Sequence, residues 1–306
     1  MAQKLVLMDH DGAIDDFLSL ILLLTMKEID LLGIVVTPAD CYIEAATRVT
    51  QKILNLMKRS AIPVAQSSAK GINPFPANFR QDCLIIDNFP ILNESFEPAN
   101  FVSKTGQEFV VEQLSNTSEP VSLMVTGPLT TIAEAIALQP DIVKKIAEIV
   151  WMGGALTVTG NVQRAFALEQ DGTAEWNVFW DAVSAKRIWE TDIPIVLCPL
   201  DLTNNVPVTS EFIQQLTRQR RHPLSDLAGL CYSLAIPQDY YFWDILATAY
   251  LARPELYTVV ERETDIITQG LSQGRTIFQA GGRKIRVMTQ VDREKFYSYL
   301  LQQFAR

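Results

Sequence analysis

Four aspartates lie in the short turn between the first two apolar segments of the chain. The segment before the turn, Lys4–Leu7, predicts a strand, and the segment after it, Phe17–Leu24, predicts a helix. The acids of the turn are Asp9, Asp11, Asp15 and Asp16. Carboxylates this close repel one another unless a cation joins them, and hard divalent cations prefer oxygen ligands. The turn therefore predicts a metal site; the alternative is a solvated loop whose Asp15 or Asp16 caps the next helix.

Downstream of this turn, short apolar segments alternate with segments of helical periodicity. Strands are expected at Leu5–Met8, Leu31–Val36, Pro63–Ala65, Val121–Val125, Ile146–Met152 and Ile193–Leu197. Helices are expected at Asp16–Lys27, Ile43–Arg59, Glu108–Leu114, Leu129–Leu138, Asp181–Glu190, Pro223–Ala235, Asp244–Ala252 and Arg293–Phe304. A stretch marked by Pro74, Pro76 and Pro90 is expected to be irregular, and Tyr257–Val287 is expected to be rich in strands.

Repeated β–α units predict an α/β fold, with a mostly parallel central sheet covered by helices on both faces. No linker, internal repeat or low-complexity tract divides the chain, so residues 1–306 are expected to form a single domain. The hydrophobic content of 48% is sufficient for a large core.

Charge and apolar runs exclude several classes of partner. A net charge of −9 argues against a nucleic acid, which usually needs a basic surface. The basic cluster at residues 218–222 is short and is expected to be an exposed helix end. The longest apolar run, Phe17–Thr25, is too short to span a membrane, and no signal peptide is visible. The four cysteines lie far apart, as expected for reduced thiols in a cytoplasmic protein rather than for a zinc site or disulfides.

Polar residues recur near the ends of predicted strands and in the adjoining loops, where a parallel sheet binds its ligands. Besides the acidic turn, they are Asp40, Thr126, Asn161, Glu175, Asn177 and Asp244. Simpler interpretations exist, since Asp40 and Asp244 could cap the helices that follow them and Trp243 could belong to the core. Their shared place in the topology favours a functional role.

The chain has only two histidines, His10 and His222. His222 lies in the basic cluster and is expected to be peripheral. His10 alternates with Asp9 and Asp11 along a strand, so it points to the opposite face if these two acids face a site. A Ser-His-Asp or Cys-His hydrolase is therefore disfavoured. Acid–base chemistry would depend on carboxylates, as in a metal-assisted hydrolase.

The run Asp9–Asp16 resembles the DxDxxxDD signature of the nucleoside hydrolases, the inosine-uridine preferring nucleoside N-ribohydrolase family. Further segments match in the same order, namely Leu32–Val36, Thr126–Thr130, Trp151–Gly154, Gly160–Val162, Ala174–Asn177 and Trp243–Asp244. The resemblance spans about Lys4 to Asp244. It implies the family's Rossmann-like α/β fold and hydrolysis of the N-glycosidic bond of ribonucleosides.

The same resemblance implies a bound calcium ion and a role for each matched residue. The implied calcium ligands are Asp11, Asp16, the main-chain carbonyl of Thr126, and Asp244. The ion would make a water molecule more acidic, and Asp11 would act as its general base. The implied ribose-binding residues are Asp15, Met152, Asn161, Glu175 and Asn177. A pocket rich in carboxylates would complement an oxocarbenium-like transition state.

Departures from the family pattern concern the base. Many relatives carry Asn where this chain has Asp40, and His, the presumed proton donor to the leaving base, where it has Trp243. Asp40 and Trp243 instead resemble the purine-specific, inosine-adenosine-guanosine preferring branch, in which two tryptophans sandwich the purine. Trp243 matches one of them and Phe79 takes the place of the other. Stacking makes a purine easier to protonate, so we expect a purine nucleosidase whose base-binding residues are Asp40, Phe79 and Trp243.

Other functions are weighed against this expectation. Broad or pyrimidine specificity is the alternative within the family. A nucleoside-binding protein without turnover and a haloacid-dehalogenase-like phosphatase are alternatives of other classes. The phosphatase fits poorly, because Ala13 lies where Thr or Val is usual and the Asp15–Asp16 pair would have no role. The purine-specific branch implies a homodimer. The preferred nucleoside, the pathway and the role of the segment Gln163–Thr173, which is longer than is usual in the family, are left open.

Overall fold

A single mixed sheet organises the molecule, and the computed structural model describes residues 3–96, 101–162, 170–236 and 239–306. The strands of these residues are β1 (Lys4–His10), β2 (Ile29–Val36), β3 (Val64–Gln66), β4 (Phe101–Val102), β5 (Val121–Val125), β6 (Ile146–Met152), β7 (Ile195–Cys198), β8 (Tyr257–Ile266), β9 (Thr276–Phe278) and β10 (Arg283–Val291). Their order across the sheet is β4-β3-β2-β1-β5-β6-β7-β10-β8-β9. Neighbours are parallel from β4 to β10, and β8 is antiparallel to both β10 and β9.

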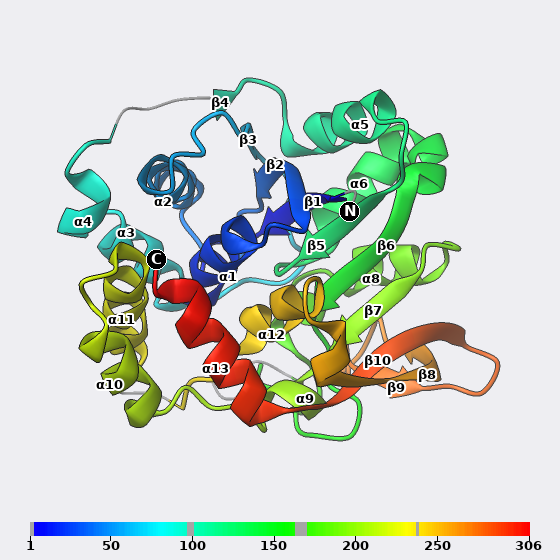
Figure 1. Cartoon of the computed structure of the whole chain (residues 1–306). Coiled ribbons are helices and arrows are strands. Elements are labelled where there is room, and N and C mark those ends of the chain that lie inside the picture. Colours follow the sequence, from blue (N-terminus) through cyan, green and yellow to red (C-terminus); the bar gives the residue numbers. More distant parts are fainter. Residues whose placement is uncertain (1–2, 97–100, 163–169, 237–238) are drawn as a thin grey trace.

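Helices cover both faces of this sheet (Figure 1). On one face lie α1 (Ile14–Thr25), α2 (Ile43–Leu56), α11 (Pro223–Ala235), α12 (Trp243–Tyr250) and α13 (Arg293–Phe304), with α10 (Ser210–Arg218) packed on α11 and α13. On the other face lie α5 (Gly106–Asn116), α6 (Thr130–Leu138) and α8 (Ala182–Trp189). Each face has its own hydrophobic core. The predicted α/β fold, with a mostly parallel sheet covered on both sides, is therefore confirmed.

Short helices complete the connections between these elements. They are α3 (Asp82–Ile86), α4 (Pro90–Asn93), α7 (Trp176–Trp180) and α9 (Leu200–Thr203), with 3-10 turns at Phe79–Gln81, Pro140–Lys145 and Pro254–Leu256. The stretch between Pro74 and Pro90, which was expected to be irregular, thus contains helical turns. α10 was not predicted either, because only Phe212, Ile213 and Leu216 form its buried face. Four predicted elements have the observed bounds, namely Val121–Val125, Ile146–Met152, Pro223–Ala235 and Arg293–Phe304.

The sheet has a topological switch point at β1. The chain leaves β1 to form β2 on one side and later adds β5 on the other side. The loops that follow β1 and β5 therefore diverge at the carboxyl edge of the sheet, which is where open α/β sheets bind ligands. The acidic turn after β1 and Thr126 after β5 lie at this edge.

The turn between β1 and α1 requires a glycine. Gly12 has φ of +82°, and a Cβ atom built on it would lie 2.7 Å from the Cβ atoms of Ala46 and Cys41. A side chain at this position would strain the backbone and clash with α2 and the loop before it. Gly12 thus allows the acidic turn to fold back against α2, and this fixes where the aspartates point.

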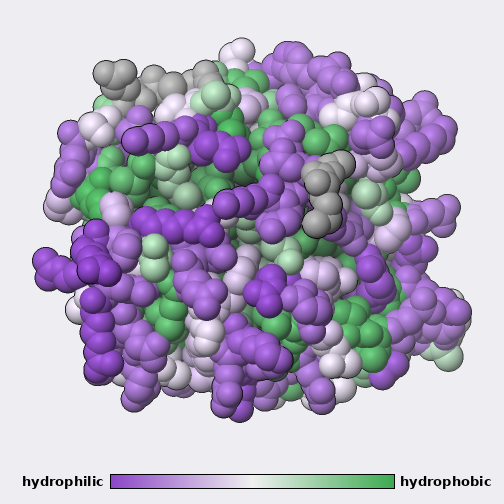
Figure 2. All heavy atoms as spheres, in the orientation of Figure 1, coloured by the Kyte–Doolittle hydropathy of each residue, from purple (hydrophilic) through white to green (hydrophobic). Residues whose placement is uncertain are grey.

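The surface on the side viewed in Figure 1 is mostly hydrophilic, with smaller hydrophobic areas between the charged side chains (Figure 2). Among the helices of the described residues, none is both long enough and apolar enough to cross a membrane.

A buried ion pair fixes α2 to the segment that carries α3 and α4. The ammonium of Lys52 lies 2.7 Å from Asp87 Oδ1 and also donates to the Asp87 carbonyl. Arg48 donates from Nε and Nη2 to Asp87 Oδ2. The side chains of Lys52 and Asp87 are only 7% and 10% exposed, so each charge depends on its partner.

We expect Asp87→Ala to lower the free energy of unfolding by about 3 kcal/mol, because it leaves the buried Lys52 ammonium without its counter-charge. Urea denaturation measures this change. Asp141→Ala is the control, because the pair of Asp141 with Lys144 is 81% exposed on both sides, and little or no loss of stability is expected from it. Equal losses in the two variants would show that the Lys52–Asp87 pair contributes no more than a surface pair.

Candidate active site

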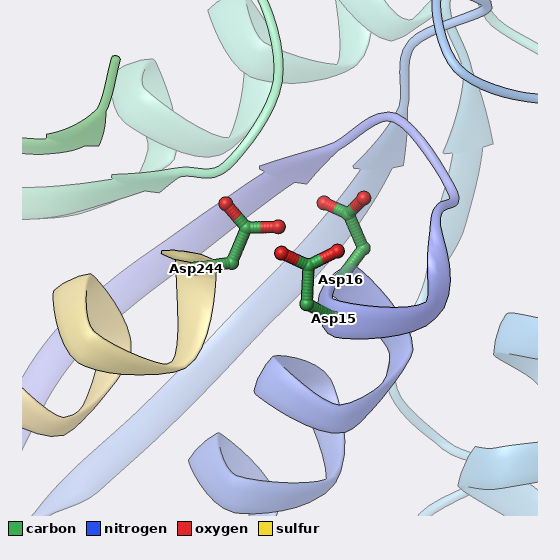
Figure 3. A group of neighbouring side chains, drawn as sticks. All are labelled: Asp15, Asp16 and Asp244. Carbon is green, nitrogen blue, oxygen red and sulfur yellow. The ribbon is translucent and has the colours of Figure 1, made fainter. Parts of the chain in front are cut away.

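Three carboxylates from two helices meet at the switch point. Asp15 and Asp16 lie in the first turn of α1, and Asp244 lies in the first turn of α12. Each offers a carboxylate oxygen, and the three oxygens lie within 4.8 Å of one another. The three side chains converge on one space between the two helix ends (Figure 3). All three residues are buried, so this cluster is a candidate cation site.

Hydrogen bonds hold Asp16 in a fixed orientation. Its Oδ2 accepts the N–H of Ala13 at 2.8 Å, which also closes the start of α1. Its Oδ1 accepts the hydroxyl of Thr126 at 2.5 Å and, more weakly, the N–H of Asp11 at 3.4 Å. The loops after β1 and β5 are thereby joined through this one carboxylate.

Asp11 and Asp40 extend the acidic region beyond the three clustered carboxylates. Asp11 is 3% exposed, and its Oδ2 accepts the N–H of Asp40 at 3.3 Å. A Cβ atom on Gly127 would lie 2.9 Å from the Cβ of Asp11, so glycine at this position lets the loop after β5 approach Asp11 closely. Asp11 therefore lies between the loops that carry Asp40 and Thr126.

Burial without a counter-charge raises the pKa values of these acids. Burial first, and then the charge of Asp16, hold the pKa of Asp11 well above its usual range. Burial and the charges of Asp15 and Asp16 do the same for the pKa of Asp244. The pKa of Asp15 is raised to about 7, mainly by burial and then by Asp16.

No salt bridge within the described residues joins any of these carboxylates to a Lys or Arg side chain. A divalent cation would supply the missing positive charge, and the surrounding donors are all oxygens, as calcium or magnesium prefers. The residues present therefore fit a hard metal ion.

A second group of polar side chains, here called the α7 wall, is built around α7 and adjoins the acidic cluster through Thr126. Glu175 caps this helix, and its carboxylate accepts the N–H groups of Asn177 and Gly154, both at 2.9 Å. The amide of Asn177 donates to the carbonyls of Thr126 at 2.8 Å and Met152 at 3.1 Å. Burial raises the pKa of Glu175 to about 6. Glu175, Asn177, Met152 and Thr126 thus form one connected group beside the acidic cluster.

Aromatic side chains adjoin both groups of polar residues. Trp243, the first residue of α12, contacts Tyr240 edge to face with ring centroids 4.6 Å apart, and also Tyr241 at 5.7 Å. Phe79 instead packs edge to face on Trp176 at 6.2 Å. The Asn161 side chain accepts the Trp176 N–H at 3.1 Å, which ties its loop to α7. The expected sandwich of a base between Phe79 and Trp243 stays a prediction.

The initial four-carboxylate interpretation of the acidic turn needs correction, since of its four acids only Asp15 and Asp16 belong to the cluster. Asp9 Oδ1 accepts the hydroxyl of Thr37 at 2.7 Å, and Asp11 lies beside the cluster, where its Oδ2 accepts the Asp40 N–H. Asp244, from far along the chain, takes part instead. The helix-cap interpretations of Asp40 and Asp244 are wrong, since the cap residues of α2 and α12 are Tyr42 and Phe242. Asp16 does cap the start of α1, because its carboxylate accepts the Ala13 N–H.

Both histidines lie away from the cluster. His10 is fully buried and its Nε2 shares a hydrogen bond of 3.0 Å with Thr50 on α2, while its ring contacts Phe17. His222 is the cap residue of α11. Of the long segment Gln163–Thr173, residues 163–169 lie outside the described part. In the remainder, the Asp171 N–H donates to the Leu271 carbonyl at 2.9 Å.

Tyr240 is a site residue whose polar contact the sequence did not predict. Its hydroxyl donates to Asp15 Oδ1 at 2.9 Å, so the aromatic wall is bonded directly to the acidic cluster. Residues 240–243 are all aromatic, but nothing in the sequence pairs residue 240 with a carboxylate 225 positions earlier.

Together, the fold and the cluster define an α/β protein with a carboxylate site for a hard cation at its switch point. Residues 6–298 match the family described as inosine-uridine preferring nucleoside hydrolase, so the chain belongs to the nucleoside hydrolases. This confirms the resemblance seen in the sequence and excludes the phosphatase alternative.

Three of the similar proteins cover almost the whole chain. The chain is 30% identical to the pyrimidine-specific ribonucleoside hydrolase RihA of Klebsiella pneumoniae, covering 98% of each chain. It is 39% identical to the inosine-uridine preferring nucleoside hydrolase of Bacillus anthracis, with a TM-score of 0.95 and 99% of each chain covered. The purine-preferring ribonucleoside hydrolase of Gardnerella vaginalis shares the fold, with a TM-score of 0.80 at 22% identity and coverage of 99% of this chain and 98% of that one.

We expect the melting temperature of the chelator-treated protein to fall as the pH rises from about 5 to about 8. An acid whose pKa is raised in the folded state binds its proton more tightly there than in the unfolded chain, and this stabilises the fold. The stabilisation is complete below the unfolded-state pKa of about 4. It is lost as the pH rises through the folded-state pKa, which is about 7 for Asp15. A divalent cation that binds only the folded site should reverse the fall, because it would replace the protons.

Differential scanning calorimetry across this pH range measures the effect. Asp15→Asn should flatten the fall, whereas Asp141→Asn, which alters an exposed aspartate, should not. A melting temperature that is constant between pH 5 and 8 would contradict the repulsion among these buried acids.

Proposed function

We propose that this nucleoside hydrolase is calcium-dependent and cleaves the N-glycosidic bond of purine ribonucleosides to ribose and free base. The observation that carries the metal part is the convergence of buried, unpaired carboxylates at the switch point. The observation that carries the purine part is Trp243, an aromatic ring without acid function directly beside that cluster on α12.

We assign the calcium ligands to Asp11, Asp16, the Thr126 carbonyl and Asp244. Asp16 and Asp244 belong to the cluster, and the hydroxyl of Thr126 is bonded to Asp16 at 2.5 Å. Asp11 supports the assignment by its burial and its N–H contact with Asp16. When bound, the ion would make a water molecule more acidic and so a better nucleophile at neutral pH.

Asp11 is proposed as the general base for that water. Burial and the charge of Asp16 raise its pKa, so its carboxylate is a stronger base than that of a free aspartate. Its place between the loops carrying Asp40 and Thr126 supports a position facing the substrate.

The ribose would lie between the cluster and the α7 wall. We assign its hydroxyls to Asp15, Asn161, Glu175 and Asn177, with Met152 beneath the sugar. The bond from Asn177 to the Thr126 carbonyl supports this arrangement, since it links the α7 wall to a proposed calcium ligand. Carboxylates on two sides of the sugar would stabilise positive charge as the ribosyl group becomes oxocarbenium-like.

The base would be held by Trp243, Phe79 and Asp40. The Trp243 Nε1 and Asp40 Oδ1 atoms are buried and find no hydrogen-bond partner within the described residues, so a donor and an acceptor remain for a ligand. Both histidines lie elsewhere, so no imidazole is available to protonate the leaving base. A purine tolerates this better than a pyrimidine, because its imidazole ring has a basic nitrogen that stacking on Trp243 helps to protonate.

Pyrimidine or broad specificity is the second candidate, and the 30% identity to RihA favours it. Nucleoside binding without turnover is opposed by the presence of every matched carboxylate. We also propose a cytoplasmic homodimer; the four buried, unpaired cysteines support a reducing compartment.

Release of free base from inosine, adenosine, guanosine, uridine and cytidine tests the proposal directly. We expect turnover of the purine nucleosides with calcium and loss of turnover after chelation. Asp244→Asn should lower kcat roughly hundredfold or more, whereas Asp239→Asn, at an exposed aspartate nearby, should not change it. Faster hydrolysis of uridine than of inosine would overturn the purine assignment, and full activity in chelator would overturn the calcium assignment.

Trp243→His tests the role of the aromatic ring. A histidine beside Asp244 would offer the leaving base a proton, so the ratio of kcat/KM for uridine to that for inosine should rise by about tenfold or more. Trp243→Phe keeps a ring without adding an acid and should leave the ratio low. An unchanged ratio in Trp243→His would show that residue 243 does not set base preference.

A further inference from the structure

A chain of buried hydroxyls runs behind the acidic cluster. Thr37 Oγ1 lies 2.7 Å from Asp9 Oδ1 and 2.6 Å from Thr131 Oγ1, and Thr131 Oγ1 lies 2.7 Å from Ser67 Oγ. The Ala69 N–H donates to Ser67 Oγ at 3.0 Å. Asp9, Thr37, Thr131 and Ser67 are all at most 5% exposed. None of these residues belongs to the proposed substrate or calcium contacts.

The direction of every hydrogen bond in this chain follows from its two ends. A hydroxyl has one hydrogen to donate. Thr37 donates its hydrogen to Asp9, so it must accept from Thr131, and Thr131 must in turn accept from Ser67. Ser67 accepts from the main chain of Ala69. The hydroxyl dipoles therefore all point toward Asp9, and removing one hydroxyl leaves buried partners on both sides unsatisfied.

The hydroxyl chain connects four elements whose loops form the site. Asp9 lies in β1, Thr37 follows β2, Ser67 follows β3, and Thr131 lies in the first turn of α6 after β5. The main chain repeats this link, because the Asp9 carbonyl accepts the Thr126 N–H at 2.9 Å and the His10 carbonyl accepts the Thr37 N–H at 2.8 Å. The proposed site groups lie close to these bonds: Asp11 directly follows His10, Asp40 lies three residues after Thr37, and Thr126 is itself bonded to Asp9.

We propose that Thr37, Thr131 and Ser67 are positioning residues that, through Asp9, set the relative placement of Asp11, Asp40 and the Thr126 carbonyl. The inference rests on the proposed function of the site. It gives Asp9, which is not one of the three clustered carboxylates, a role of its own, because its Oδ1 is the end of an internal network. Sub-ångström shifts of these loops would change calcium coordination and the alignment of the general base.

Thr131→Val tests the proposal, because it replaces the hydroxyl by a methyl group of similar shape. The matched control is Thr130→Val, which removes an equally buried hydroxyl in the same helical turn; Thr130 Oγ1 donates to Asp181 at 3.0 Å, outside the chain of hydroxyls. Both variants should lower the melting temperature. Only Thr131→Val should also lower kcat, by about ten- to hundredfold, and weaken calcium binding measured by calorimetry. KM should change less than kcat, since no substrate contact is removed.

Two further variants separate positioning from general destabilisation. Thr131→Ser keeps the hydroxyl and should restore most of the lost kcat and calcium affinity. Ser67→Ala interrupts the network furthest from Asp9 and should have a smaller effect than Thr37→Val. Equal kcat and equal calcium affinity in Thr130→Val and Thr131→Val would overturn the proposal, as would failure of Thr131→Ser to recover either quantity.

Failure of the proposed function would be seen separately, in the unmodified protein. If that protein hydrolyses no nucleoside but binds calcium, the calorimetric comparison of Thr130→Val with Thr131→Val still tests the positioning role. If the protein neither turns over nucleosides nor binds calcium, the site assignment itself is wrong and the positioning role is rejected with it.

Discussion

The repulsion among buried aspartates is the constraint on which the rest of this structure depends. Asp11, Asp15, Asp16 and Asp244 are each at most 4% exposed, and among the residues that the structure describes no Lys or Arg forms an ion pair with them. Burying one unpaired charge costs several kcal/mol, and neighbouring like charges add to that cost. The fold tolerates the cluster through helix N-termini, hydroxyls and main-chain N–H groups directed at the carboxylates. Such an arrangement is stable only in a core large enough to offset it, and the two hydrophobic layers of the sheet provide that core.

Much of this architecture follows from local sequence patterns. The period of apolar residues gave the α/β class, and elements such as Val121–Val125 and Pro223–Ala235 have the predicted bounds. The strand ends then located Asp40 and Thr126 at one edge, because parallel strands carry their ligands at the carboxyl ends. Short helices such as α3 were missed because five residues are too few to show a period. Assigning individual roles depended on the resemblance to a family, since the pattern alone does not separate a ligand from a neighbouring acid.

The remaining features depend on contacts between residues far apart in the chain. Asp9 and Asp11 are both aspartates and lie two residues apart, yet the Asp9 carboxylate accepts the Thr37 hydroxyl and the Asp11 carboxylate accepts the Asp40 N–H. Two features explain this difference. Gly12, with its positive φ, turns the chain after Asp11, and the hydroxyls of Thr37, after β2, and Thr131, in α6, bind the Asp9 side. The hydrogen bond between Tyr240 and Asp15 could not be predicted from the sequence either, because a tyrosine in an aromatic run gives no indication of a polar partner far along the chain.

Residues 243 and 244 connect substrate choice to metal chemistry through one helix start. Consecutive residues in a helical turn point about 100° apart, so the first turn of α12 can direct Trp243 toward Tyr240 and Tyr241 and Asp244 toward Asp15 and Asp16. Residue 243 can therefore change without moving the carboxylate beside it, provided that the helix keeps its start. Tyr240 limits this independence, because its ring packs on Trp243 while its hydroxyl is bonded to Asp15. A smaller side chain at position 243 would loosen Tyr240, and the change would reach the acidic cluster through that hydroxyl. Base preference and catalytic rate are thus coupled at this one tyrosine, while the hydroxyl chain behind β1 acts on the cluster from the other side.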